Sequence, residues 1–373
     1  MLQILTFGLS GVTRGGIETF VMAFAEQTGE QCTYDLVLTE DNTIADYAHT
    51  ARHIYRIAPY HKQPLRYIRD IVRLVRRHRR EIDAVWYNQF NTINILPILV
   101  CRCMGLKVIL HAHNNDVPQR SRLYRIVNGF GRQLCGCFSA LRLSNSDAST
   151  RFIYPRRRWA DTHIIYNAIH VERFAFDAAR RQALRQAMGI AEGTRVVGFV
   201  GRLAAQKNPL FALDIFHALH ERHPDTVLVM VGDGPLRSQV EERVAALSLK
   251  EAVRLPGRRD DVPALYSAFD VMLTPSLFEG LGIVLVEAQA GGLPCLTTSG
   301  TVPDMVTVTS LVHRETLEAP AGRWAEHLCR IMTEAPANRA AYMAQVQASP
   351  FNIATEGQRF VHILRRFVNE STD

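Results

Sequence analysis

The chain has 373 residues, which exceeds one ordinary domain and suits two domains that each bury a core. Hydrophobic residues make up 47% and charged residues 21%, as in a globular protein, and no run approaches the roughly 18 uninterrupted apolar residues of a membrane span. The net charge of +7 is uneven, because residues 1–170 hold 22 Lys and Arg against 13 Asp and Glu, and residues 171–373 hold 21 against 23. An anionic partner is therefore expected for the first half.

The first half predicts a parallel sheet covered by helices. Short apolar or β-branched runs alternate there with segments of helical length. The opening run has no basic region before it and no cleavage site after it, so we interpret it as a strand rather than a signal peptide. The expected strands lie at 2–7, 34–39, 83–88, 107–112 and 140–145, and 162–169 closes the sheet.

A charged, Ala-rich stretch at 176–188 precedes a second series of strands and helices. Its expected strands lie at 195–201, 226–234, 252–257, 270–276 and 293–298, with an amphipathic helix at 209–223. The sequence thus predicts an α/β protein with two doubly wound, Rossmann-like domains, at 1–170 and 171–350, and a hinge near 168–190.

The last segment, 351–373, predicts a C-terminal helix. At 355–370 it places Phe360, Ile363, Leu364 and Phe367 on one helical face. That face needs an apolar surface to cover it, and we expect the helix to return to the first domain.

The seven cysteines predict neither a metal site nor a disulfide framework. The pairs Cys101/Cys103 and Cys135/Cys137 lie in expected helices, where positions i and i+2 point to different faces. An odd count without an export signal favours a reducing cytoplasm.

Two loops that follow expected strands carry candidate anion-binding groups. Gly11, Gly15 and Gly16 lie between the first strand and a helix, where bare backbone can approach a phosphate or a sugar. Arg202 and Lys207 follow the first strand of the second half and can neutralise a diphosphate. On these residues alone, a simple chain turn and two solvated cations remain open alternatives.

The stretch PSLFEGLGIVLVEAQAGGLP, 275–294, favours the anion-binding interpretation. It predicts a loop and then a helix that begins near Ile283, so that Gly282 presents free N–H groups at a positive helix end. Glu279 precedes this end, and Glu287 lies a little more than one turn inside the helix. A phosphate at the terminus with hydroxyl groups on either side suits this arrangement. Glu287 has apolar neighbours, so we expect a partner for its carboxylate.

A glycosidase acid and nucleophile are a weaker interpretation of the two glutamates. Eight helical residues rise about 12 Å, which exceeds the roughly 5–5.5 Å between the carboxyl groups of retaining hydrolases. The spacing weakens this interpretation without excluding it.

Together these motifs resemble retaining glycosyltransferases of the GT-B fold, in glycosyltransferase family 4. The resemblance covers most of the chain and is most specific in the second half. Its closest likeness is to enzymes of bacterial exopolysaccharide or capsule synthesis. It rests on RGGIE (14–18), HAHN (111–114), IIYNAIHVERF (164–174), VGRLAAQKNP (200–209), VGDGP (231–235) and the stretch from 255 to 294 with its two glutamates.

This resemblance implies a nucleotide-sugar site in the second domain. Arg202 and Lys207 would hold the diphosphate and stabilise the departing nucleotide, while Glu279 would bind hydroxyls of the donor sugar and Glu287 those of the ribose. Backbone N–H groups at Gly280, Leu281 and Gly282 would contact the phosphates and sugar, and Leu255, Gly257 and Arg258 would border the base.

For the first domain, the resemblance implies an acceptor side facing the donor across a cleft. Gly15 and Gly16 would face the diphosphate, His113 would lie near the reacting sugar, with His111 as the alternative, and Glu18 would lie in the acceptor-side helix. Catalytic roles then fall to His113, Arg202, Lys207 and Glu279. Transfer would retain the anomeric configuration. No DxD motif occurs, so no metal or other cofactor is implied, and the donor would be a UDP-sugar.

Two positions depart from the family pattern. His170 stands where the family usually has Asp, and Asp304 stands where a Glu is common. We expect the first to be a hinge variation, and we assign no donor contacts within 299–318.

A basic helix expected at 64–81 suggests a membrane partner. Leu65, Ile68, Val72 and Val75 fall on one side among arginines. A second cluster, 152–159, mixes aromatic and arginine side chains. With a polyprenyl-diphosphate-linked saccharide as the acceptor that the resemblance implies, the enzyme would bind the inner face of the plasma membrane peripherally. The alternative is that the apolar side is buried in its own domain.

Other functions explain the sequence less well. A nucleotide-sugar epimerase of the same fold would also cradle a phosphate, and it would need no acceptor. A phosphorylase would need a pyridoxal-phosphate lysine site, for which no motif is distinctive. Nucleic-acid binding would rest on arginine clusters alone, since no recognisable binding module occurs, so nucleic acid is not an expected partner.

Overall fold

A computed structural model describes residues 1–373 apart from 10–15, 41–49, 90, 114–120, 337 and 371–373. Its contacts divide the chain into two compact units. Unit 1 comprises Met1–Ala168 and Ile353–Asp373, and unit 2 comprises Ile169–Asn352. The boundaries expected from the sequence, after residues 170 and 350, fall within a few residues of these divisions.

The described residues of unit 1 form a seven-stranded parallel sheet in the order β3-β2-β1-β4-β5-β6-β7. Its central strands are buried on both faces, which suits their apolar and β-branched residues. The strands are β1 (Leu2–Phe7), β2 (Cys32–Thr39), β3 (His53–Ile57), β4 (Ala84–Gln89), β5 (Val108–Ala112), β6 (Leu141–Ser144) and β7 (Thr162–Ile164).

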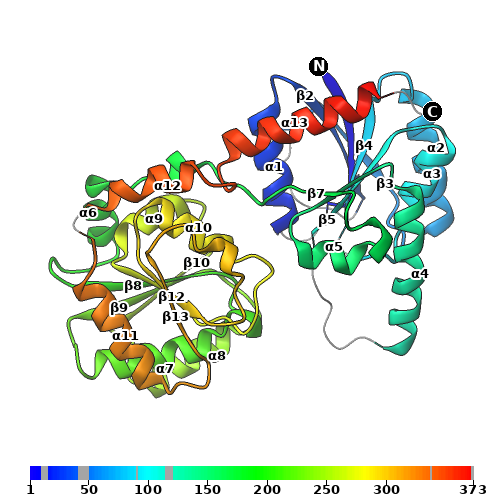
Figure 1. Cartoon of the computed structure of the whole chain (residues 1–373). Coiled ribbons are helices and arrows are strands. Elements are labelled where there is room, and N and C mark those ends of the chain that lie inside the picture. The colour runs from blue at the N-terminus through cyan, green and yellow to red at the C-terminus, as the bar shows by residue number, and fades with distance from the viewer. Residues whose placement is uncertain (10–15, 41–49, 90, 114–120, 337, 371–373) are drawn as a thin grey trace. The chain divides into compact units, whose positions relative to one another are not determined.

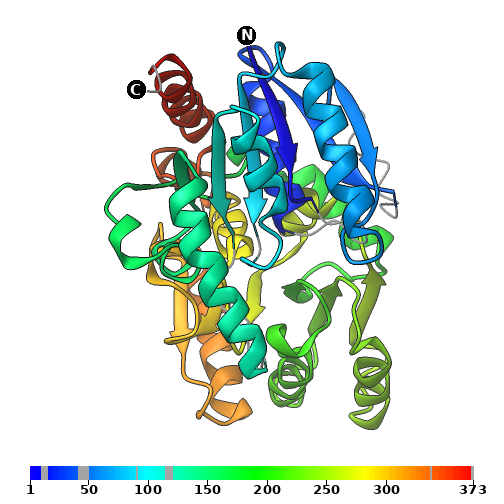
Figure 2. The same ribbon diagram turned by 90° about the vertical axis from the view of Figure 1, so that its right-hand side faces the viewer.

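Helices cover both faces of this sheet (Figures 1 and 2). Because successive strand residues point to opposite faces, Ile4 packs in the core with α1 and α13, and Leu5 packs in the core with α2, α3 and α4. The helices are α1 (Gly16–Thr28), α2 (Pro64–His78), α3 (Leu96–Cys103), α4 (Arg122–Phe138), α5 (Asp147–Ile153) and α13 (Ile353–Asn369).

The C-terminal helix α13 lies beside α1, as Figure 1 shows in red and blue. The Phe24 and Phe360 rings are 5.3 Å apart, and Leu364 is fully buried in the same core. Ile363 and Phe367 are partly buried there. At the other end of the helix, Lys107 Nζ donates to the carbonyl oxygens of Phe367 and Val368, at 3.1 and 2.8 Å. The expected return of this helix to the first domain is confirmed.

The described residues of unit 2 form a six-stranded parallel sheet in the order β10-β9-β8-β11-β12-β13. One face is covered by α7, α8 and α11, which share a core with the sheet. The strands are β8 (Arg195–Val200), β9 (Thr226–Val231), β10 (Val253–Gly257), β11 (Val271–Thr274), β12 (Cys295–Thr298) and β13 (Val312–Glu315). The helices are α6 (Ala178–Ala187), α7 (Pro209–His220), α8 (Arg237–Ala246), α9 (Val262–Ala268), α10 (Ile283–Ala290), α11 (Ala321–Thr333) and α12 (Met343–Gln347).

Three strands differ from the sequence prediction. The edge strands β3 and β13 were not predicted, because both carry exposed or half-exposed charged residues and so lack an apolar run. The strand predicted at 162–169 is shorter, and β7 ends at Ile164. The tail of that run leads out of the sheet instead of extending it.

The basic helix α2 buries its apolar side within unit 1. Its buried residues are Tyr67, Ile71, Leu74 and Val75, whereas Leu65 is 82% exposed. Of the four residues expected on the apolar side, only Val75 is fully buried, because the true face is rotated from the predicted one. Within the described ranges, no helix is both long and apolar enough to cross a bilayer.

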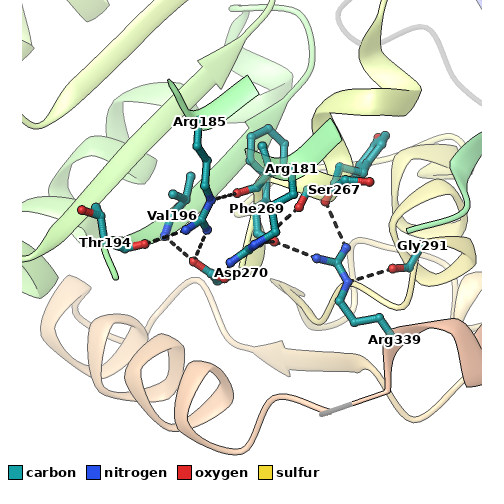
Figure 3. A network of polar contacts seen from close by, with 11 residues as sticks. Arg181, Arg185, Thr194, Val196, Ser267, Phe269, Asp270, Gly291 and Arg339 are labelled. Carbon is teal, nitrogen blue, oxygen red and sulfur yellow. Dashed lines mark hydrogen bonds and ion pairs between the residues drawn. The ribbon is translucent and has the colours of Figure 1, made fainter. Parts of the chain in front are cut away.

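An arginine network lies at the amino ends of the strands of the unit 2 sheet (Figure 3). Asp270 accepts hydrogen bonds from Arg181 at 2.5 Å, from Arg185 at 2.7 Å and from the Val196 amide at 2.7 Å. Arg339 donates to the carbonyl oxygens of Tyr266, Phe269 and Gly291 at 2.9 to 3.0 Å. The network fastens the first helix of the unit, α6, to the start of β8 and β11.

Burial lowers the pKa of two arginines in this network. Desolvation lowers the pKa of Arg339 to about 10, and it also lowers the pKa of Arg185. Both guanidinium groups remain charged at neutral pH, so the network holds more positive charge than the single Asp270 carboxylate balances. The backbone carbonyl groups supply the remaining negative partial charge.

We predict that Asp270→Ala destabilises unit 2 by about 2–3 kcal/mol, because two arginines lose a charged hydrogen-bond partner in a partly buried place. Hydrogen exchange of the β8 and β11 amides measures this loss. Asp304→Ala is the matched control, since that carboxylate is 98% exposed and 3.3 Å from Arg314. The free energy of unfolding of this control should stay within about 0.5 kcal/mol of that of the wild type. Equal protection in all three proteins would contradict the prediction.

Candidate active site

The order of the strands reverses between β8 and β11 in unit 2 and between β1 and β4 in unit 1. In an open parallel sheet, ligands bind beyond the carboxyl ends of the strands at such a reversal. The loops after β8 and β11 carry Arg202, Lys207 and Glu279, so three predicted site residues emerge at the reversal point of unit 2.

Lys207 and Glu279 form an ion pair at this edge. The distance from Lys207 Nζ to Glu279 Oε1 is 2.6 Å, and the same oxygen accepts a hydrogen bond from Ser276 Oγ at 2.7 Å. Both side chains are largely buried, with 17% and 6% of their surface exposed. Among the described residues, no group donates to the second oxygen, Oε2. The carboxylate is thus fixed through one oxygen and offers the other to a ligand.

Backbone contacts join these two loops to each other and to the loop after β12. The Leu277 amide donates to the Gln206 carbonyl at 2.8 Å, and the Glu279 amide donates to the Thr301 carbonyl at 3.1 Å. The VGDGP motif packs against the loop after β8, since a Cβ atom at Gly234 would lie 2.4 Å from the Leu203 carbonyl oxygen. Gly234 therefore allows close approach of two loops, a role that the motif alone did not reveal.

Arg202 is exposed, in contrast to Lys207. Among the residues that the structure describes, no hydrogen-bond or ion-pair partner contacts its guanidinium group. An unpaired guanidinium beside a buried ammonium is suited to a multiply charged anion.

The helix α10 begins at Ile283, as predicted, with Gly282 as its N-cap residue. Gly282 has φ +81°, a left-handed conformation that favours glycine, and no side chain caps the helix end. The first amide groups of the helix therefore have no intrahelical partner. A Cβ atom at Gly280 would meet nothing within 4 Å, so the loop also leaves open space beside this terminus. Leu281, between them, is buried.

Glu287 has the partner that its apolar neighbours require. Its Oε2 accepts a hydrogen bond of 2.6 Å from the hydroxyl group of Tyr266, which is fully buried in α9. Burial raises the pKa of Glu287, and the Tyr266 hydrogen bond and the charge of Lys207 oppose this increase. Tyr266 was not predicted as a site residue, because it lies 21 positions upstream on another helix.

The three residues expected to border a base lie at the same edge, at the end of β10. Gly257 accepts a hydrogen bond from the Gly232 amide at 2.9 Å, and the Leu255 carbonyl accepts one from Arg237 at 3.3 Å. Arg258 follows with an exposed side chain. The structure thus places these residues two strands away from Lys207 in the sheet.

In unit 1, His113 lies at the carboxyl end of β5. Its Nε2 is 2.8 Å from Asn88 Oδ1, and its ring lies 4.2 Å from the ring of His111. Because Asn88 Nδ2 donates to the Phe7 carbonyl, Oδ1 is the acceptor and His113 carries its proton on Nε2. Burial lowers the pKa of His113 to about 3, so the ring is neutral at physiological pH and its Nδ1 is a hydrogen-bond acceptor.

His111 lies deeper than His113. It is fully buried, and its Nδ1 accepts a hydrogen bond from Trp86 Nε1 at 3.3 Å. Of the two histidines, His113 is thus the one at the strand end. Asn88 was not predicted, although a polar residue at the end of a buried strand is a usable signal.

The glycine loop of unit 1 is only partly described. Gly11 and Gly15 lie outside the described residues, and Gly16 is the first residue of α1, with open space where a Cβ atom would lie. Glu18 is buried in the first turn of that helix. Elsewhere in the described parts of the chain, no group of three or more His, Cys, Asp or Glu residues could hold a metal ion.

The sequence matches known proteins along most of its length. A family model described as glycosyl transferases group 1 matches residues 180–345. The EpsF protein of Bacillus subtilis (strain 168), named as a glycosyltransferase, is 30% identical over 334 residues, which cover 86% of each chain. The chain belongs to the glycosyl transferases group 1 family. Membership of a glycosyltransferase family, which the resemblance implied, is thereby confirmed.

A second relative and a solved structure extend this result. A galactosyltransferase of Escherichia coli, named for UDP-Gal and α-D-GlcNAc-diphosphoundecaprenol, is 25% identical over 78% of this chain and 76% of its own. The structure of Anabaena HepE in complex with UDP-glucose has a TM-score of 0.79, with 21% identity over 98% of this chain and all of that one. The structural likeness confirms the predicted GT-B fold with two Rossmann-like domains.

We predict that Tyr266→Phe raises the pKa of Glu287 further, because the hydroxyl that stabilises the carboxylate is lost. Carboxyl ¹³C NMR titration measures the change, with Glu287→Gln used to assign the signal. The ionised carboxylate is a stronger hydrogen-bond acceptor than the protonated group. As the pH falls, any ligand that donates to Glu287 should therefore lose affinity at a higher pH in the variant than in the wild type. Identical Glu287 titration curves in the variant and the wild type would contradict this prediction. Tyr342→Phe, which removes a tyrosine hydroxyl elsewhere in unit 2, is the control.

Proposed function

We propose that the protein is a retaining glycosyltransferase that moves a sugar from a UDP-sugar to a lipid-linked saccharide in bacterial exopolysaccharide or capsule synthesis. The observation that carries this proposal is the group formed by Lys207, Glu279 and the uncapped start of α10 at the reversal point of the unit 2 sheet. The EpsF relative supports the exopolysaccharide setting, and the E. coli relative supports a UDP-sugar donor and a polyprenyl-diphosphate acceptor.

The proposed donor site binds each part of a UDP-sugar through a different group. The diphosphate contacts Arg202, Lys207 and the amides at Gly282 and beyond, where the helix end favours negative charge. Lys207 can keep its bond to Glu279, because an ammonium group has three donors. Glu279 uses its free Oε2 for a sugar hydroxyl, and Glu287 accepts from the ribose hydroxyls. Leu255, Gly257 and Arg258 border the uracil.

The proposed reaction exchanges one bond at the anomeric carbon for another. The bond from this carbon to the phosphate oxygen breaks, an acceptor hydroxyl oxygen attacks on the same face, and its proton passes to the departing UDP. Negative charge grows on UDP in the transition state, where Arg202 and Lys207 stabilise it most strongly. The two cations and the helix end supply this stabilisation, so we propose that transfer needs no metal ion. For neutral His113 we propose the catalytic role that the resemblance implies, with Nδ1 as the ring atom that remains to accept a hydrogen bond.

We predict that Lys207→Ala and Glu279→Ala each retain the fold but lose transfer by about 10²–10³, because each removes a preorganised charged group from the site. The assay measures UDP release and glycosylated lipid from a panel of UDP-sugars with polyprenyl-diphosphate-linked acceptors. Lys250→Ala is the matched control, since Lys250 is exposed in the same unit. Near-normal turnover by either site variant would contradict the assignment.

The same assay separates transfer from epimerisation. A transferase consumes the donor at a useful rate only when the acceptor is present. Conversion of the sugar nucleotide in the absence of any acceptor would identify an epimerase instead. Product stereochemistry, determined by NMR of the new linkage, tests retention.

A further inference from the structure

The helix α4 exposes apolar side chains on one side. Ile126 is 62% exposed, Val127 41% and Phe130 68%. Positions 126 and 130 are four residues apart and 127 and 130 are three apart, so the three side chains adjoin on the helix surface. In contrast, α2 exposes one large apolar residue, Leu65, in its first turn. Here we call Ile126, Val127 and Phe130 the α4 apolar face.

The opposite side of α4 is firmly anchored in unit 1. Thr92 donates to Asn128 Oδ1 through both its amide and its hydroxyl group, at 3.1 and 2.7 Å. A Cβ atom at Gly131 would lie 2.0 Å from the Thr92 carbonyl oxygen, so loop and helix touch there. Arg132 donates to the carbonyl oxygens of Arg151 and Tyr154. With the helix held by these contacts, the α4 apolar face cannot turn inward without breaking them.

Cations lie near both ends of α4. Arg122 and Arg125 are exposed on the same half of the helix, and α4 contains no Asp or Glu. Near the other end, Arg157 lies 3.4 Å from the Cys137 sulfur and Arg158 donates to the Gly136 carbonyl. Among the described residues, Arg122, Arg125 and Arg157 have no carboxylate partner. The helix therefore carries uncompensated positive charge beside its exposed apolar groups.

We propose that the α4 apolar face and its flanking arginines bind the interface of an anionic membrane. Apolar side chains enter the boundary between headgroups and acyl chains, while arginines bind lipid phosphates, which is the binding mode of interfacial amphipathic helices. A neutral apolar partner protein would leave these arginines without counter-charges. The inference rests on the proposed lipid-linked acceptor, and it assigns the expected membrane contact to α4 instead of α2.

The position of α4 in unit 1 suits this role. The helix follows β5 in the chain, and β5 ends next to His113. Figures 1 and 2 show the first turns of α4 extending beyond the carboxyl ends of the unit 1 strands. Docking of these turns would bring that edge of the sheet to the surface where a polyprenyl-linked saccharide is found.

Vesicle binding of matched variants tests the proposal. The probes are vesicles of phosphatidylcholine alone and of phosphatidylcholine with phosphatidylglycerol, in low and high salt, with sedimentation as the readout. The wild type should bind the anionic vesicles, less so in high salt. Ile126→Gln with Phe130→Gln should weaken this binding about tenfold or more, whereas Leu65→Gln on α2 should leave it unchanged.

A second pair of variants compares charges at equal spacing. Arg122→Gln with Arg125→Gln should weaken binding to anionic vesicles and reduce its salt dependence. Arg73→Gln with Arg76→Gln removes the same charge, at the same spacing, from the exposed side of α2 and should change binding much less. The proposal would be overturned if the α2 and α4 double variants lost equal affinity for anionic vesicles. It would also be overturned if the wild type bound neutral vesicles as strongly as anionic ones, or bound neither.

Activity with a short-chain, water-soluble acceptor separates this inference from the proposed function. The α4 variants should retain wild-type transfer in solution and lose it only when the acceptor is embedded in vesicles. A loss of transfer in solution would place the α4 apolar face in the acceptor site and overturn membrane docking. Vesicle binding through α4 without transfer to any acceptor would instead refute the proposed function and leave this inference standing.

Discussion

The ion pair between Lys207 and Glu279 joins the two loops at the reversal point of the unit 2 sheet. Separating two largely buried charges would leave each without its partner, which is costly. The loops after β8 and β11 are therefore held as one piece, with Ser276 fixing the same carboxylate oxygen. The uncapped start of α10 follows three residues after Glu279, so its position depends on this pair as well. The groups that we propose to bind an anion are therefore held by the same ion pair.

A second set of polar contacts, at the amino ends of the strands, holds the helices of the same sheet in place. Asp270 and its arginines bind the strand starts to α6, and Arg339 binds the carbonyl groups that end α9 and α10. Those two helices carry Tyr266 and Glu287, which contact each other. Charges at the amino edge thus fix the elements that present hydrogen-bonding groups toward the carboxyl edge. A site built on such elements keeps its geometry better than one built on loops alone.

Sequence reasoning predicted the candidate site from residues whose chemistry coincides with an expected strand end or helix start. The start of α10 could be predicted because glycine and a following apolar run mark a helix terminus. The sequence does not single out Tyr266, because its importance comes from a contact with Glu287, 21 positions along the chain. Asn88 was missed, although its place at the end of a buried strand is a usable signal. The edge strands β3 and β13 were missed for a related reason, since their polar residues resemble loops until a neighbouring strand pairs with them.

The helices α2 and α4 show why amphipathic patterns mislead when judged alone. In α2, an evident apolar stripe is used for the core of its own unit. In the first half of α4, Asn128 and Gly131 face inward and large apolar residues face outward, whereas Cys135 in the second half is buried in the core. Hydrophobicity predicts burial on average, but hydrogen bonds such as those from Thr92 to Asn128 also hold a polar side of a helix inward.

The return of α13 to unit 1 makes unit 2 an insertion within the sequence of unit 1. During synthesis, the ribosome therefore translates all of unit 2 before the last helix of unit 1. Until then, the surface of α1 around Phe24 lacks its cover, and the nascent chain carries an exposed aromatic patch. Chain termination shortly before residue 353 would leave that patch permanently open, and such a product would be prone to aggregate or to be degraded even with every donor-site residue in place.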